Sequence, residues 1–144
     1  RENNGLTYDS GVFYPSRKFN APFLIYLTVS ESKASLTLNL LLSVWNDLLS
    51  KKISKNELLL AKQKLSKSFL HNFRTCEDII LRKVCLLGFD MDPFYDEKVT
   101  DSLEAITSDQ ILNLSKKYLN YPCISVSGNK QICENLKEIW KKKY

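Results

Sequence analysis

The sequence predicts an α+β fold in which a small, mostly antiparallel sheet is covered on one face by helices. Two hydrophobic periodicities lead to this prediction. Apolar residues alternate with polar ones in parts of the first 30 residues, as in strands, and recur three and four residues apart from Ser32 onward, as in amphipathic helices. The length of 144 residues fits one domain with one core. No apolar run reaches the about 18 residues of a membrane-spanning helix, so no membrane partner is expected.

Two strands are expected at the start of the chain, over residues 6–14 and 23–29. The segment between them, 15–22, contains two prolines and several polar residues, so the strands should form an antiparallel hairpin with a long loop. A third, short strand is expected over residues 123–127. The apolar residues of the first strand should share one face: Leu6, Tyr8, Val12 and Tyr14.

Helices are expected over most of the remaining chain. Ser54 and Glu57 have the spacing of a capping box at a helix start, and so have Thr107 and Gln110. The long pattern after Ser54 should bend or break near residues 71–75, where helix propensity is low. The predicted helices cover residues 32–52, 54–88, 93–103, 108–119 and 130–143.

The positive charge of the chain does not indicate a nucleic-acid partner. The net charge is +5 and the pI is about 9.0, but the lysines are scattered between apolar helix positions and near helix ends. No nucleic-acid-binding motif accompanies them. We therefore expect a solvated basic surface.

The chain is not expected to bind a metal by itself. Its four cysteines, Cys76, Cys85, Cys123 and Cys133, have no C-x-x-C spacing. His71 is the only histidine, and no second His or Glu stands three or four residues from it. Free, buried thiols are the expected state of the cysteines.

Four stretches of the chain, in order, are similar to one peptidase family. They are R-E-N-N-G-L-T-Y at residues 1–8, I-S-K-N-E-L-L-L-A-K at 53–62, I-T-S-D-Q-I-L-N-L-S-K-K-Y-L at 106–119 and I-S-V-S-G at 124–128. The chain thus resembles the pitrilysin and insulinase (mitochondrial-processing-peptidase-like) family of zinc metallopeptidases. It lacks the family's H-x-x-E-H motif. The resemblance therefore implies the C-terminal portion of a half that does not bind zinc.

This resemblance implies a fold, a cofactor and partners. Residues 1–144 would be one incomplete half-domain of a longer chain, a two-layer ferredoxin-like α/β sandwich. Zinc and the general base would belong to an N-terminal zinc-binding half or subunit, and the substrate would be an extended peptide. The chain alone would then bind no zinc and cleave nothing.

Arg1 and Tyr8 are the two residues that match functional positions of the family, in catalysis and substrate binding. When water attacks a peptide carbonyl, an oxyanion develops, and a preorganised donor contributes about 3 to 4 kcal/mol to its stabilisation. The Tyr8 hydroxyl would donate toward the scissile carbonyl oxygen, and the Arg1 guanidinium would hold substrate backbone or charge nearby. No metal ligand transfers.

Two other functions stay open from the sequence. The chain could be a catalytically inactive family scaffold that binds extended peptides, or a basic nucleic-acid-binding module unrelated to proteolysis. Because the expected sheet lacks strands that a complete half would have, an unpaired edge is also expected. Such a chain could form a homodimer, swap a segment or retain a partner segment.

Overall fold

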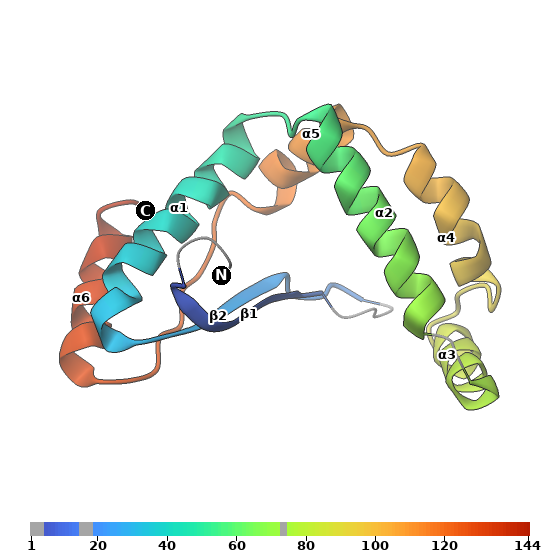
Figure 1. The fold of residues 1–144 in the computed structure, drawn as a ribbon, viewed down its shortest axis with the longest axis horizontal. Coiled ribbons are helices and arrows are strands. Elements are labelled where there is room, and N and C mark those ends of the chain that lie inside the picture. The colour runs from blue at the N-terminus through green and yellow to red at the C-terminus, as the bar shows by residue number, and fades with distance from the viewer. Residues whose placement is uncertain (1–4, 15–18, 73–74) are drawn as a thin grey trace.

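The computed structural model describes residues 5–14, 19–72 and 75–144. Over these residues the chain has six α-helices, one short 3₁₀-helix and one two-stranded antiparallel sheet, which confirms the predicted α+β class. Figure 1 shows the helices forming an arch over one side of the sheet. The last part of the chain lies at one end of this arch.

The sheet is the predicted hairpin. Strand β1 spans Thr7–Phe13 and strand β2 spans Leu24–Val29, so each predicted strand is right to within one residue at every end. The two strands pair antiparallel, with Phe13 opposite Leu24 and Ser10 opposite Leu27. The register changes between Thr7 and Asp9, where β1 has one more residue than the facing part of β2.

Helix α1 spans Ala34–Ser50 and follows the 3₁₀-helix η1 at Glu31–Lys33. It packs against the last two helices of the chain, and the main core cluster lies along it. Asp47 is the single charged residue of α1. None of the helices in the described part of the chain has the length and hydropathy needed to cross a bilayer. The core cluster consists of Ala34, Leu38, Leu42 and Leu136, with Val29, Ile124, Val126, Ile132, Ile139 and Trp140 packed against it.

The long helical pattern in the middle of the chain is two helices, as the predicted break requires. Helix α2 spans Lys55–Asn72 and α3 spans Cys76–Gly88. The Ser54 hydroxyl accepts a hydrogen bond from the backbone N–H of Glu57 at 3.2 Å, and the Glu57 carboxylate accepts one from the backbone N–H of Ser54 at 2.9 Å. These two bonds form the predicted capping box. Thr75 begins α3 through a second capping box, with Asp78.

The three remaining helices also lie close to their predicted ranges. Helix α4 spans Tyr95–Glu104, α5 spans Ser108–Tyr118 and α6 spans Lys130–Lys141. The predicted start of α4 at residue 93 is two residues too early. The Asp92 carboxylate accepts from the backbone N–H of Phe94 at 2.9 Å and holds a turn there before the helix begins.

The predicted strand at residues 123–127 is wrong as an element of the sheet. In this segment Ile124 and Val126 are half-buried against the core cluster, while Cys123, Ser125 and Ser127 are exposed. It has the alternation of a strand, but it pairs with neither β1 nor β2. Its sequence therefore encodes a strand-like face without a hydrogen-bonding neighbour.

The chain exposes far more surface than a folded monomer of its size. Its accessible area is 11221 Å², whereas a compact monomer of this mass exposes about 7,600 Å². Few apolar side chains of the described residues are buried: Ala34, Leu38, Leu42, Leu86, Leu103 and Leu136.

The prediction that the cysteines are buried is wrong. Cys76, Cys85 and Cys123 are exposed, and Cys133 is half-buried. All four are free thiols, as predicted.

Candidate functional site

Tyr8, the stronger of the two predicted catalytic residues, lies in strand β1 with an accessible side chain. Its exposed fraction is 72%. The β1–β2 hairpin carries it, and β2 runs directly into η1 and α1, which anchor the hairpin to the core cluster through Val29. A tyrosine packed inside the core could not serve as a donor, so the position of Tyr8 is compatible with a role toward a ligand.

The change of register in β1 falls on Tyr8. Thr7 lies opposite Val29 and Asp9 lies opposite Thr28, so that Tyr8 is the residue of β1 without a facing residue. The predicted single face of Leu6, Tyr8, Val12 and Tyr14 is therefore interrupted, because strict alternation does not continue across such an irregularity. β-Bulges are enriched next to active sites, where they re-aim a side chain.

Two hydrogen-bonding groups lie close to Tyr8 in the sequence. The Lys33 ammonium, at the start of the helical part, donates to the backbone carbonyl of Gly5 at 2.8 Å. The hydroxyl oxygen of Thr7 is buried and has no hydrogen-bond partner in the described part of the chain. A buried hydroxyl without a partner costs about 1 to 3 kcal/mol. The backbone before Tyr8 is thus tied to Lys33, while the Thr7 hydroxyl has unused hydrogen-bonding capacity.

A glycine in β1 lets an aromatic ring lie across the hairpin. Gly11 faces Tyr26, and a Cβ at Gly11 would meet the Tyr26 hydroxyl oxygen at 2.5 Å. The sequence analysis did not find this contact. A glycine opposite a tyrosine becomes recognisable only after the register is known.

Arg1, the second predicted catalytic residue, lies outside the described residues. Of the two predicted residues, the structure therefore describes Tyr8 alone. In the ranges 5–14, 19–72 and 75–144, no group of three or more His, Cys, Asp and Glu side chains is arranged to hold a metal ion. His71 lies in α2.

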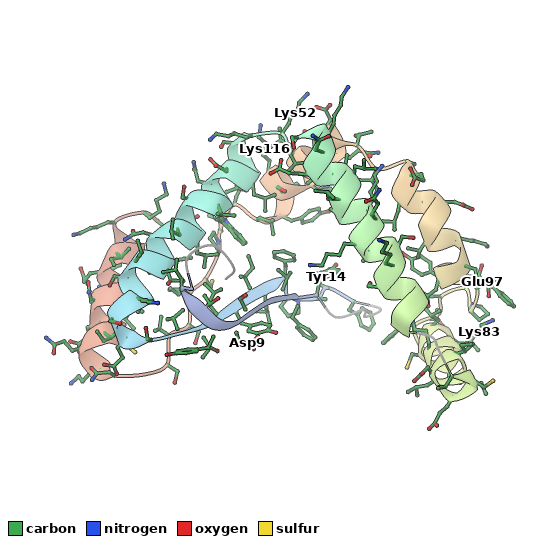
Figure 2. The ribbon with its side chains drawn as sticks, viewed as in Figure 1. Asp9, Tyr14, Lys52, Lys83, Glu97 and Lys116 are labelled. Carbon is green, nitrogen blue, oxygen red and sulfur yellow. The ribbon has the colours of Figure 1, made fainter. Side chains whose placement is uncertain are left out.

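Three lysines of the described residues lie at separate places in the fold. Figure 2 shows Lys52 and Lys116 near the top of the arch and Lys83 near its far end, each well away from Asp9 on the hairpin. Several lysines are also paired with acids, including Lys52 with Asp109 at 2.5 Å and Lys83 with Glu97 at 3.3 Å. The expectation that the chain has no nucleic-acid partner stays a prediction.

No family model, curated protein or solved structure matches the chain.

Proposed function

We propose that this chain is the C-terminal portion of the non-zinc half of a zinc metalloendopeptidase of the pitrilysin and insulinase type. The observation that carries the proposal is the position of Tyr8. It ends the R-E-N-N-G-L-T-Y stretch, lies where the register of β1 changes, and exposes most of its side chain. This is the geometry expected of a strand residue that is aimed at a ligand.

In this proposal Tyr8 and Arg1 act on the substrate, and the metal is held elsewhere. Zinc bound by residues of an N-terminal half or subunit would activate the attacking water. The phenol O–H of Tyr8 donates to the carbonyl oxygen of the scissile peptide bond as negative charge develops on it. The guanidinium of Arg1 binds the substrate backbone or a neighbouring charge. No residue of this chain is assigned to the metal.

The open architecture supports a role as part of a larger protein. The sheet has two strands, and the exposed area exceeds that of a compact monomer by about 3,600 Å². An incomplete ferredoxin-like half, closed by the zinc-binding half, accounts for both features. Between the two halves an extended peptide would be enclosed and shielded from water.

The test is the substitution Tyr8→Phe in the complete peptidase. We expect turnover to fall by about one to three powers of ten, the loss that follows removal of one oxyanion donor. The zinc content should stay unchanged, because Tyr8 does not touch the metal site.

Tyr14→Phe is the matched control. Tyr14 follows β1 and is also exposed, and its ring, which contacts Phe23 at 6.4 Å between centroids, is retained in phenylalanine. The turnover of the Tyr14→Phe variant should remain within about twofold of that of the parent peptidase. Equal turnover of Tyr8→Phe and Tyr14→Phe would refute the catalytic assignment of Tyr8.

A further inference from the structure

A groove lies on the surface between α1 and α6. The two helices are in contact, and Figure 1 shows them side by side at one end of the arch. The groove has a volume of about 450 Å³, and sites for small molecules occupy about 300 to 1,000 Å³. Two of its lining residues are Leu42, which belongs to the core cluster, and Ile139, which packs against it. The groove therefore has an apolar part that the core holds in place.

Polar side chains of α1 line one wall of the groove. Asn39, Ser43 and Asn46 are four and three residues apart, and all three are exposed. This spacing places them on one face of the helix. The Asn39 amide nitrogen donates to the Ser35 carbonyl at 3.0 Å. In the described part of the chain, the Ser43 hydroxyl and the Asn46 side-chain amide have no hydrogen-bond partner. This wall thus offers hydrogen-bond donors to a ligand.

Two lysines line the groove on the side of α6. Lys142 and Lys143 directly follow this helix, and neither forms an ion pair with an acid of the described residues. Lys141 beside them, in contrast, pairs with Glu138 at 2.8 Å. The hydrogen bond from Lys141 lowers the pKa of Glu138, and the charge of Lys142 adds a smaller contribution. No acidic side chain of the described residues lines the groove, so its two positive charges have no negative charge within it.

Two carbonyl groups at the end of α6 are paired with backbone donors. Free carbonyls at a helix C-terminus carry partial negative charge, which would oppose an anion. The backbone N–H of Lys142 donates to the Glu138 carbonyl at 3.3 Å. The N–H groups of Lys143 and Tyr144 donate to the Trp140 carbonyl at 2.9 and 3.1 Å. These bonds reduce the negative charge that the helix end presents beside the two lysines.

The charge and the donors of the groove are complementary to a phosphate. A lysine ammonium acts as a point charge and binds phosphates, whereas the planar fork of arginine matches the two oxygens of a carboxylate. The groove is lined by two lysines and, among the described residues, by no arginine. A phosphate monoester carries a charge of about −1.5 to −2 at pH 7, which two lysines balance. A nucleic-acid backbone requires a longer line of cations than these two.

We propose that this groove binds a small organic phosphate monoester. The ammonium groups of Lys142 and Lys143 bind the phosphate oxygens, and the polar side chains of α1 donate hydrogen bonds to them. The organic part of the ligand packs on Leu42 and Ile139. The proposal uses neither Tyr8 nor Arg1, so its test can fail or succeed independently of the peptidase role.

The test is isothermal titration calorimetry of the complete chain with phenyl phosphate at pH about 7.5. We expect saturable binding with a Kd of about 1 mM or tighter. Inorganic phosphate should bind at least about threefold more weakly, because it has no apolar group to cover Leu42 and Ile139. Benzoate, which carries a single negative charge, should also bind at least about threefold more weakly. In an NMR titration with phenyl phosphate, the side-chain amide signals of Asn39 and Asn46 should shift.

Three substitutions test the two sides of the groove. Lys142→Gln and Lys143→Gln should each weaken the binding of phenyl phosphate by about fivefold or more, because each removes one charge-assisted contact. Ser43→Glu places a negative charge on the wall formed by α1 and should abolish saturable binding. Lys137→Gln is the matched control, because Lys137 is an exposed lysine of α6 that does not line the groove. It should weaken binding by less than about twofold. Far-ultraviolet circular dichroism checks that all variants fold.

Vesicles of phosphatidylcholine and phosphatidic acid distinguish a lipid headgroup from a soluble phosphate. Phosphatidic acid carries the same phosphate monoester as phenyl phosphate. If the chain binds both and Lys142→Gln weakens both, the groove accepts a lipid headgroup. If the chain binds phenyl phosphate and does not sediment with the vesicles, the ligand is a soluble phosphate. Both results support the proposal.

Three results would overturn the proposal. The first is the absence of saturable binding of phenyl phosphate, even where the vesicles bind. The second is an equal loss of affinity in Lys137→Gln and Lys142→Gln, which indicates attraction to the net charge of the chain. The third is equal affinity for phenyl phosphate and benzoate, which indicates that the groove does not distinguish a phosphate from other anions.

Discussion

The ion pair between α3 and α4 allows a stability prediction from geometry. Arg82 donates from Nε to one carboxylate oxygen of Asp96 at 2.7 Å and from a terminal nitrogen to the other at 2.9 Å. The two side chains are 25% and 15% exposed. The hydrogen bond to Asp96 raises the pKa of Arg82, which favours the charged guanidinium. The substitution Asp96→Asn keeps the shape of the side chain and removes its negative charge.

The expected loss lies between two known limits. Exposed ion pairs contribute about 0 to 1 kcal/mol, and breaking a fully buried pair costs about 3 to 5 kcal/mol. With most of both side chains covered and one hydrogen bond retained by the amide oxygen, Asp96→Asn should reduce the free energy of unfolding by about 2 kcal/mol. This corresponds to a fall in Tm of about 4 to 8 °C for a chain of this length. Urea unfolding followed by circular dichroism measures it.

Glu138→Gln is the matched control. It breaks the ion pair between Glu138 and Lys141, which has a similar distance of 2.8 Å but side chains that are 62% and 69% exposed. The effect of Glu138→Gln should be clearly smaller than that of Asp96→Asn, because solvent weakens exposed ion pairs. A double-mutant cycle with Arg82→Gln isolates the coupling between Arg82 and Asp96. The reasoning is refuted if Asp96→Asn and Glu138→Gln have equal effects, or if the cycle gives no coupling.

Two further predictions concern the hairpin and the start of α4. Gly11→Ala should reduce the free energy of unfolding by about 1 kcal/mol, because the new Cβ displaces the Tyr26 ring. Urea unfolding should show a smaller loss when Gly11→Ala is made in a Tyr26→Ser background. An equal loss in that background would contradict displacement of the ring as the cause. The hydrogen bond from Lys98, together with the backbone N–H of Phe94, lowers the pKa of Asp92 from its ordinary 3.8. Asp92 thus stabilises the fold above that value and loses this contribution as the pH falls through its lowered pKa. In Lys98→Gln, an NMR titration should show the pKa of Asp92 moving back toward 3.8, and an unchanged titration would contradict this assignment.

The helices could be predicted because the signals that start them are local. Thr107 and Gln110 form the predicted capping box, with the Thr107 hydroxyl accepting at 3.2 Å and the Gln110 side-chain oxygen accepting at 2.8 Å. Thr75 and Asp78 have the same spacing, whereas the break predicted near residues 71–75 rests on low helix propensity alone. The capping box was the stronger signal, since it predicts a new helix and its first residue.

Contacts between distant parts of the chain could not be predicted in the same way. Arg82 and Asp96 are 14 residues apart, and no periodicity of a single element relates them. The register of β1 against β2 likewise depends on one extra residue at Tyr8, which alternation cannot reveal. The position of the candidate site in β1 was therefore predictable, whereas the way in which Tyr8 leaves the regular ladder was not.

Helix α1 has apolar residues on two faces. Leu38 and Leu42 bury one face of α1 in the core cluster. On the other face Leu36, Leu40 and Val44 recur every four residues and remain 54%, 41% and 66% exposed. A helix that is apolar on both faces is typical of the interior of a larger structure. Alternation and periodicity record which residues are apolar, and so the sequence predicts more core than the described residues bury.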